Sequence, residues 1–315
     1  MVEYFTKSML ERSDTVSVEV RNLRKTFGDF VAVDNLSFSL DKEGVFALLG
    51  TNGAGKTTTI RMILGMLEKD CGEVLFEGRP IDAVSDPIGY LAEERGLYPK
   101  VNVMEQLVYF ATLRGMTRAD ALAGINYWLD RLEVGQYKDK KANQLSKGNQ
   151  QKIQLISALV TEPQLLILDE PLSGLDPVNA NQFREVIRDE VKKGKYIIMS
   201  SHQMSTIEEF CQDIVILNKG KAVLKGNLGE IKKSYGRVNL AVKSDDDISQ
   251  IARRAGLVLK EKTPEESLFR VSGEEQARAF LADAVSCGAS IVKFELTEPS
   301  LHEIFVEKVG EQNGL

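Results

Sequence analysis

The sequence predicts an α/β domain over residues 15–235 and a small α+β domain over residues 236–315. In the first domain, the apolar run 44–49 leads through a glycine-rich loop into a stretch whose apolar residues recur at helical spacing. In the second, the residue pattern predicts the order strand, helix, strand, strand, helix, strand, which is that of ferredoxin-like folds. A helical subdomain at about 100–160 is expected to interrupt the first domain.

The composition is that of a soluble globular protein, with 43% hydrophobic and 27% charged residues in a chain of 315. The net charge of -6 argues against nucleic acid as a partner. No apolar run approaches the ~18 residues that a membrane span needs. Residues 1–14 lack the apolar core of a signal peptide and are expected to be a loose leader. Three scattered cysteines indicate a reducing compartment. We therefore expect a cytoplasmic protein that needs a second polypeptide for any role at a membrane.

The turn between the two strands expected before the glycine-rich loop contains an aromatic candidate. Valines alternate over residues 16–20, and a second alternating stretch, 31–40, is divided by the turn pair Asp34-Asn35. Phe27 falls between these two stretches. Its ring is suited either to stacking on a nucleotide base or to packing in an ordinary turn, and both interpretations stay open.

The glycine-rich loop has the spacing G-x-x-x-x-G-K-[ST] of a phosphate-binding loop. Its glycines allow successive backbone N–H groups to face one concavity, and the dipole of the following helix favours an anion there. Lys56 is expected to reach the β- and γ-phosphates of a nucleotide, and the Thr57 hydroxyl to ligate Mg²⁺. The predicted binding residues of the loop are Gly50, Thr51, Asn52, Gly53, Ala54, Gly55, Lys56, Thr57 and Thr58.

A second acidic element follows the predicted helical subdomain. The apolar strand 165–168 ends in Asp169-Glu170, and adjacent carboxylates repel each other unless a cation or a reaction requires them. Asp169 is therefore predicted to hold Mg²⁺, and Glu170 to orient or deprotonate an attacking water. A loop with surface acids is the alternative.

Two further segments are candidates because of their positions. Ser146 is expected to cap a helix that begins in LSKGN, and Asp176-Pro177 to start another helix, which runs to about residue 193. His202 follows the predicted strand 196–200, at a strand end where α/β sites gather, although a lone histidine is more often structural.

These motifs together resemble the ATP-binding-cassette (ABC) family of transporter ATPases over residues 16–235. The segments GTNGAGKTT, LLILDEP and SGLD resemble its phosphate loop, its Mg²⁺ strand and the loop that crosses its dimer. LSKGN resembles the family signature LSGGQ. The resemblance implies that Ser146 and Gly148 contact the γ-phosphate across a dimer, with Asp176 in the crossing loop. It also implies that Phe27 stacks on the base, that His202 contacts the γ-phosphate, and that Glu93 holds Mg²⁺ or its water.

Two departures from the family pattern stand out. Lys147 replaces the first glycine of the signature and Asn149 its glutamine, while Glu93 stands where the family usually has glutamine. The ending TEPSLHEIFVEKV and the segment around Glu93 resemble the sodium-exporter-like and drug-exporter-like branch. The resemblance implies a fold of the P-loop NTPase type, ATP and Mg²⁺ as cofactors, an integral-membrane permease as partner and a second ATPase subunit, expected to be an identical copy. It also implies a peripheral position on the cytoplasmic face of the membrane.

Two other functions remain as alternatives at this point. One is a soluble, non-transport ABC protein acting on ribosomes, DNA or iron–sulfur assembly. The ribosomal type usually carries two cassettes and the DNA-end type long coiled coils, whereas this sequence has one phosphate loop and no long coiled coil between the motifs. A generic phosphate-loop kinase would leave LSKGN and SGLD unexplained. The small C-terminal domain shows no catalytic constellation, which favours an interaction or regulatory role for it.

Overall fold

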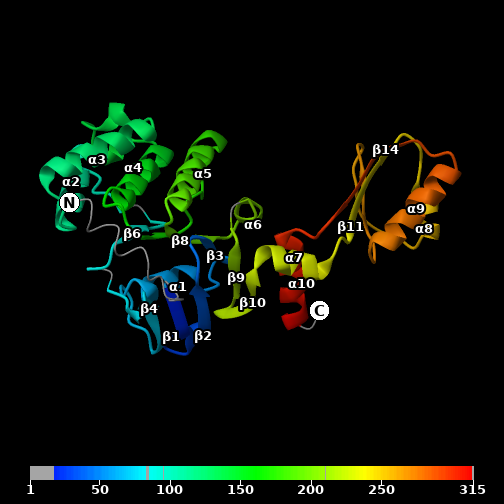
Figure 1. Ribbon diagram of the computed structural model, residues 1–315, viewed down its shortest axis with the longest axis horizontal. Helices are drawn as coiled ribbons and strands as arrows, with labels where there is room; N and C mark the ends of the chain where they lie inside the picture. The colour runs from blue at the N-terminus through cyan, green and yellow to red at the C-terminus, as the bar shows by residue number, and fades with distance from the viewer. Residues whose placement is uncertain (1–17, 83–84, 95, 210, 314–315) are drawn as a thin grey trace, which may run out of the picture. The chain divides into compact units, whose positions relative to one another are not determined.

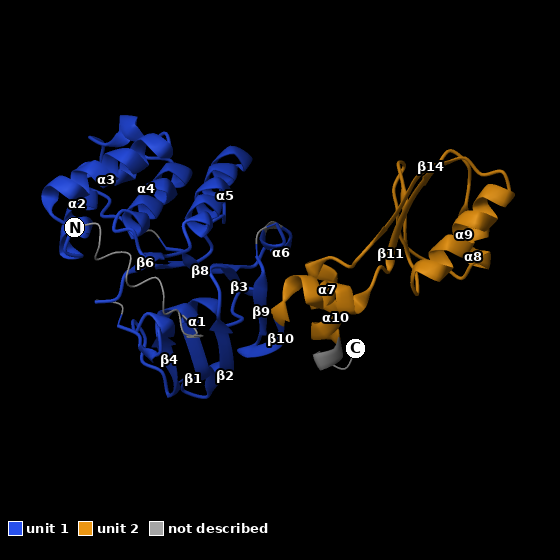
Figure 2. Cartoon of the chain, viewed as in Figure 1, with its two compact units in different colours: residues 1–225 blue, residues 226–315 orange. Residues whose placement is uncertain are grey.

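The computed structural model describes residues 18–82, 85–94, 96–209 and 211–313, so the predicted leader lies outside the described residues. The chain forms two compact units, residues 1–225 and 226–315 (Figure 2). The sequence-based boundary after Tyr235 differs from this division by one helix, α7 (Leu228–Tyr235), which belongs to the second unit.

The core of the first unit is a six-stranded sheet in the order β10-β9-β3-β8-β7-β6 (Figure 1). Strands β6, β7, β8, β3 and β9 run parallel, because each enters the sheet after a crossover. The strand β3 is buried along its whole length, as expected for a central strand covered on both faces. The strands are β3 (Gly44–Gly50), β6 (Ile88–Leu91), β7 (Leu165–Leu168), β8 (Tyr196–Ser201), β9 (Asp213–Asn218) and β10 (Lys221–Asn227).

A second, antiparallel sheet has the order β2-β1-β4-β5, and the helix α1 (Lys56–Ile63) packs in a hydrophobic core shared by the two sheets. Ile60 and Ile63 of this helix are fully buried in that core. This packing fixes the start of α1 at the end of β3, where the glycine-rich loop lies. The strands are β1 (Val18–Phe27), β2 (Phe30–Leu40), β4 (Cys71–Phe76) and β5 (Arg79–Pro80).

The predicted turn at Asp34-Asn35 is wrong, since β2 continues through it as one strand. Asn35 has a φ of 51°, and the ladder between β1 and β2 changes register between Leu23 and Lys25. Asparagine tolerates this left-handed conformation in a turn and in a β-bulge alike. Because β1 pairs with β2 on both sides of the irregularity, the result is a bend in the strand.

The predicted helical subdomain is confirmed as three packed helices, α2 (Val103–Leu113), α3 (Arg118–Arg131) and α4 (Lys147–Leu159), which lie side by side in Figure 1. Asn102, Thr117 and Ser146 cap their first turns with side-chain oxygens. The other helical segments of the unit are the 3₁₀ turns η1 (Gly135–Tyr137) and η2 (Ala142–Gln144), α5 (Pro177–Lys192) and α6 (Met204–Ile207). No helix in the described part of the chain combines the length and apolarity that crossing a bilayer requires.

The second unit has the predicted ferredoxin-like arrangement, with the antiparallel sheet order β12-β13-β11-β14. Phe269 of the sheet packs on Phe280 of a covering helix, with ring centroids 6.1 Å apart. The elements are β11 (Asn239–Ser244), α8 (Ser249–Arg254), β12 (Val258–Lys262), β13 (Ser267–Arg270), α9 (Glu274–Ser286), β14 (Ile291–Thr297) and α10 (Leu301–Asn313).

Glu303 fixes the first turn of α10 to this sheet. Its carboxylate accepts hydrogen bonds from Asn239 Nδ2 (2.8 Å), the Ser300 N–H (2.8 Å) and the Ser300 hydroxyl (3.0 Å), and it pairs with Lys260. Partial burial would raise the pKa of Glu303, but these donors outweigh burial and lower it to about 2. Because the folded pKa lies below the ordinary value of 4.5, the stabilisation is complete above that value and is lost as the pH falls toward 2.

Glu303→Gln should therefore lower the free energy of unfolding of the second unit by about 1–2 kcal/mol at neutral pH, after allowance for solvent screening. Denaturant titration at pH 7 and at pH 3 measures the effect, which should shrink at the lower pH. Glu265→Gln, at an exposed acid in the turn before β13, is the matched control. An equal loss for both variants, or a loss that does not depend on pH, would contradict this assignment.

Candidate nucleotide-binding site

The glycine-rich loop connects β3 to α1, and two of its glycines are required by close backbone contacts. A Cβ on Gly50 would lie 2.5 Å from the Leu217 carbonyl oxygen, and one on Gly55 would lie 2.6 Å from that of Ala32. Both residues also have positive φ, 151° and 106°. No side chain in the described ranges caps α1, so its first N–H groups stay available to an anion.

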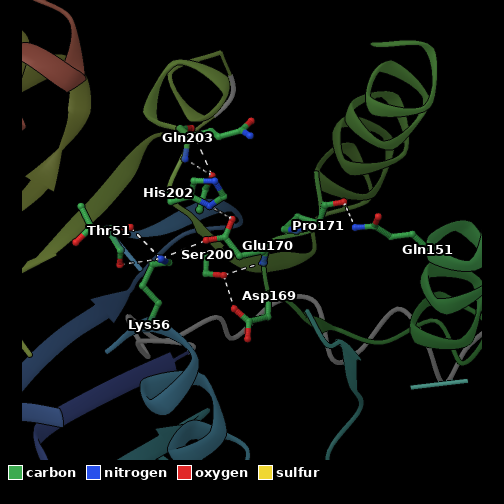
Figure 3. A network of polar contacts seen from close by, with 11 residues as sticks. Thr51, Lys56, Gln151, Asp169, Glu170, Pro171, Ser200, His202 and Gln203 are labelled. Carbon is green, nitrogen blue, oxygen red and sulfur yellow. Dashed lines mark hydrogen bonds and ion pairs between the residues drawn. The ribbon is translucent and has the colours of Figure 1, made fainter. Parts of the chain in front are cut away.

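The ammonium group of Lys56 is buried within this loop. Its Nζ donates to the carbonyl oxygens of Gly50 (2.9 Å) and Thr51 (3.3 Å) and lies 3.2 Å from Glu170 Oε1. Figure 3 shows the side chain turned back toward the end of β7, from which Glu170 extends. The loop thus holds a fixed cation beside the helix N-terminus, the arrangement that a phosphate chain requires.

The carboxylate of Asp169 is fully buried at the end of β7. The Ser200 hydroxyl, at the end of the neighbouring strand β8, donates to Asp169 Oδ1 (2.5 Å) and accepts from the Glu170 N–H (2.8 Å). Burial raises the pKa of Asp169, while the hydroxyls of Ser200 and Thr57 oppose that shift. Burial and, to a smaller extent, the carboxylate of Asp169 raise the pKa of Tyr90 to about 12.

These residues fit a magnesium ion. Asp169 Oδ2 is buried with no hydrogen-bond partner among the described residues, and a buried orphan oxygen of a carboxylate is a suitable ligand. No cluster of three or more His, Cys, Asp or Glu side chains that could bind a metal occurs in the described ranges. Mg²⁺ does not need such a cluster, because it usually takes one or two carboxylates and completes its shell with waters and substrate phosphates.

Glu170 is held by two basic side chains in a strained backbone conformation. Its φ is 50°, in the left-handed region that non-glycine residues rarely adopt and that is common at functional sites. Its Oε2 lies 2.8 Å from His202 Nδ1, and its Oε1 faces Lys56 (Figure 3). His202 is thus placed on the carboxylate of Glu170, a contact that the sequence did not predict.

A pocket of about 360 Å³ lies over the loop. Phe27 and Phe30 face each other at the end of the β1–β2 hairpin, and both rings are more than half exposed. Lys25 Nζ lies 5.6 Å from the centroid of the Phe27 ring. The pocket is lined by Phe27, Phe30, Ala32, Asn52, Gly53, Ala54, Gly55, Lys56, Thr57, Thr58, Glu93 and Glu170.

The remaining predicted residues do not line this pocket in the described structure. Ser146 is the exposed N-cap of α4, and its hydroxyl accepts from the Asn149 N–H (3.3 Å). Gly148 lies in the first turn of α4, and Asp176 caps α5 by accepting from the N–H groups of Val178 and Asn179. The structure therefore brings together the loop, the acidic pair and His202, and leaves Ser146, Gly148 and Asp176 outside the pocket over the loop.

The sequence reasoning missed four positions of the candidate site and its surroundings. Ser200, Gln151 and Gln154 each hydrogen-bond to a segment far away in the chain, and Phe30, which pairs with Phe27 in the hairpin, lines the pocket together with the distant glycine-rich loop. The only local signal was the position of Ser200 at the end of a strand that runs beside the acidic one.

Comparisons with known proteins identify the class to which this fold and site belong. Residues 33–173 match the family model described as "ABC transporter", and residues 226–309 match "ATP-binding protein DrrA1-3-like, C-terminal domain". A solved structure described as the ATP-binding subunit of an ABC transporter is 29% identical with a TM-score of 0.64, covering 70% of this chain and 93% of that one. The fold is therefore that of an ABC ATPase, as the sequence predicted.

Curated relatives establish the family. The uncharacterized ABC transporter ATP-binding protein YhaQ of Bacillus subtilis is 47% identical over 292 residues, covering 92% of this chain and 98% of the relative. The linearmycin resistance ATP-binding protein LnrL of the same organism is 28% identical, covering 93% of this chain and 98% of the relative. The Nod factor export ATP-binding protein I of Burkholderia lata is 33% identical, covering 66% and 70%. This chain belongs to the ABC transporter ATP-binding proteins, which hydrolyse ATP to power transport.

Proposed function

We propose that this chain binds ATP with Mg²⁺ in the pocket above its phosphate loop, and that two subunits enclose the nucleotides and drive an exporter permease. One observation carries the proposal. The pocket contains the loop and Glu170, but the signature segment, with Ser146 exposed at the start of α4, lies outside it. A site that lacks its signature is completed when a second subunit supplies one.

The residues of the pocket have separable roles in this proposal. Lys56 moves its hydrogen bonds from the carbonyl oxygens of the loop to the phosphates, and the free N–H groups at the start of α1 bind the same anion. Glu170 accepts a proton from the attacking water, while His202 orients its carboxylate. Thr57, Asp169 and Glu93 would hold Mg²⁺ or its waters, and a bound ion would supply positive charge to neutralise the phosphates. Phe27 stacks on the base.

The exposed start of α4 is suited to the γ-phosphate of a nucleotide bound by the second subunit. The Ser146 hydroxyl and the first N–H groups of α4 form a polar, positive helix end. Gly148 allows Asn179 of α5 to approach this helix end closely, since a Cβ there would lie 3.0 Å from Asn179 Nδ2. We propose an identical second copy as the partner subunit, with Asp176 at the crossing loop.

An apolar surface beside Glu93 is proposed as the contact with the permease. Tyr98 follows the Glu93 segment and stacks on Phe110 of α2, with ring centroids 5.8 Å apart. Half or more of the side chains of Tyr98, Tyr109 and Leu113 is exposed. Exposed apolar groups of this kind mark a protein contact more often than a ligand site. A permease docked there would hold the protein on the cytoplasmic face of the membrane.

Co-purification with the membrane fraction tests this contact. Tyr109→Glu and Leu113→Glu should each reduce recovery of the permease at least tenfold, because a charge is placed in an apolar interface. ATP binding by the isolated protein should stay unchanged. Val285→Glu, at an exposed apolar residue of the second unit, is the control. Full recovery of the permease with both α2 variants would contradict the assigned surface, and capture of ribosomes or nucleic acid alone would support a non-transport role.

Export rather than import is supported by the names of the resistance and export relatives and by the DrrA1-3-like C-terminal match. Accumulation of linearmycin in inside-out membrane vesicles is a first test of direction. It should depend on ATP and be abolished by Lys56→Ala, and ATP-dependent loss from preloaded inside-out vesicles would indicate import.

The domain organisation is part of the proposal. Every residue assigned to the nucleotide lies before residue 204, so a chain ending at Tyr235 should bind ATP with unchanged affinity while losing regulation or persistence of the dimer. Calorimetric ATP binding and ATPase rates of the truncated and full chains measure this. A truncated protein that is folded but fails to bind ATP would show that the boundary is wrong.

A further inference from the structure

A second, smaller pocket adjoins the nucleotide pocket. Its volume is about 120 Å³, and it shares two lining residues, Glu93 and Glu170, with the larger one. A charge placed in the smaller pocket therefore acts on the carboxylates that face the nucleotide. The lining residues are Glu93, Lys147, Gln151, Gln154, Glu170 and Ser173.

One face of α4 forms a wall of this pocket. Lys147, Gln151 and Gln154 are spaced i, i+4 and i+7, so they share that face. Gln151 Nε2 donates to the Pro171 carbonyl oxygen (2.7 Å), and Gln154 Nε2 donates to that of Glu94 (3.0 Å). Each carbonyl directly follows a lining carboxylate, Glu170 or Glu93. The helix therefore holds the two acidic loops at a fixed place beside Lys147.

Lys147 and Glu93 carry opposite charges, and neither is paired with another described residue. Both side chains are exposed, and among the described residues neither takes part in a hydrogen bond or ion pair. The stem of Lys147 crosses Gly174, where a Cβ would lie 2.6 Å from Nζ. Glycine at that position lets the ammonium group lie over the loop that carries Ser173. Lys56 is paired with Glu170 and is not among the lining residues of the smaller pocket. Among the described residues, the lysine that lines this pocket is Lys147.

We propose that Lys147 is a positioning residue whose ammonium group offsets the carboxylate of Glu93 within the same subunit, so that Glu93 does not repel the phosphates of ATP. The proposal rests on the placement of ATP in the larger pocket. It explains together the two departures of this chain from the family pattern, because the added negative charge at Glu93 and the added positive charge at Lys147 meet at one pocket. Like charges near a bound anion weaken its binding, and an opposite charge restores it.

A double-mutant cycle of Lys147→Met and Glu93→Gln tests the proposal, with ATP affinity measured by calorimetry in EDTA and with Mg²⁺. Methionine keeps the stem of Lys147 and removes its charge. Lys147→Met should weaken ATP binding about fivefold when Glu93 is present and less than about 1.5-fold beside Glu93→Gln, because contacting charges are not additive. Lys147→Arg should retain wild-type affinity. The difference between the two backgrounds should shrink in 0.5 M NaCl, at which salt screens exposed charges.

Lys69→Met, at an exposed lysine that lines neither pocket, is the control and should change nothing. An equal effect of Lys147→Met in both backgrounds would overturn the proposal, since a packing role or a contact with the nucleotide of a second subunit does not depend on Glu93. No effect in either background would overturn it as well. Failure of ATP placement is recognised separately, because Lys56→Ala would then bind ATP like the wild type.

Discussion

Lys56→Ala is expected to weaken ATP binding by at least about a hundredfold, or about 2.7 kcal/mol, because several charge-assisted hydrogen bonds to phosphate are lost together. The side chain is buried, and its only hydrogen bonds among the described residues are to the carbonyl oxygens of Gly50 and Thr51. A phosphate placed in the loop would replace these weaker acceptors. Equilibrium calorimetry with ATP and Mg²⁺ measures the loss.

The substitution also leaves the buried carboxylate of Glu170 with His202 as its remaining basic neighbour, which costs stability. Circular dichroism and the unfolding temperature must therefore show that the variant is folded before its affinity is interpreted. Lys69→Ala serves as the control for loss of a surface charge. A folded Lys56→Ala protein with wild-type affinity would remove the assignment of the phosphate loop.

Glu170→Gln is expected to keep ATP binding and to reduce the turnover rate by at least about a thousandfold, or about 4 kcal/mol in the barrier, because an amide cannot accept the proton from water. Glutamine has the shape of the original side chain, so its carbonyl oxygen can still face His202 Nδ1 or Lys56. Steady-state ATPase assays and nucleotide binding separate the two effects.

With ATP and Mg²⁺, the Glu170→Gln protein should accumulate as a dimer, since hydrolysis no longer separates the subunits. Size-exclusion chromatography with light scattering detects it. Addition of Lys56→Ala to this variant should return it to the monomer, because the dimer then lacks bound ATP. A monomeric Glu170→Gln protein that hydrolyses ATP at the wild-type rate would contradict both the assignment of Glu170 as the general base and the proposed ATP-dependent dimer.

The elements whose pattern is local were predicted closely. The strand Leu165–Leu168 has the predicted bounds, because an apolar run before an acidic pair is a complete signal in itself. At Asn35 the same local reasoning failed, since a residue that permits positive φ does not say whether the chain turns or bends. In the structure, β2 continues as one strand through Asn35 because it pairs with β1 on both sides of that residue.

In the candidate site too, the residues of a contiguous motif were predictable from the sequence, and the contacts between distant segments were not. The loop residues are contiguous, so one motif located them together. The contact of His202 with Glu170 joins the ends of β7 and β8, and the contacts of Gln151 and Gln154 join α4 to two loops. Such contacts depend on sheet order and helix placement, which no short motif encodes. The sequence around a helical glutamine does not indicate whether its side chain hydrogen-bonds to a distant loop or faces solvent.

The hydrogen bonds of the two α4 glutamines, Gln151 and Gln154, couple the position of this helix to that of the two acidic loops. Gln151 donates a hydrogen bond to the peptide that follows Glu170, and Gln154 donates one to the peptide that follows Glu93. A rigid-body rotation of α4 must therefore either move both acidic loops with the helix or break these hydrogen bonds. In a pair of subunits, this helix would present its tip to the neighbour's nucleotide while its flank holds the base of its own site. A movement of α4 would then affect both ATP sites. The displacement that withdraws the signature from the neighbour's nucleotide would also misalign Glu170 in the subunit to which the helix belongs.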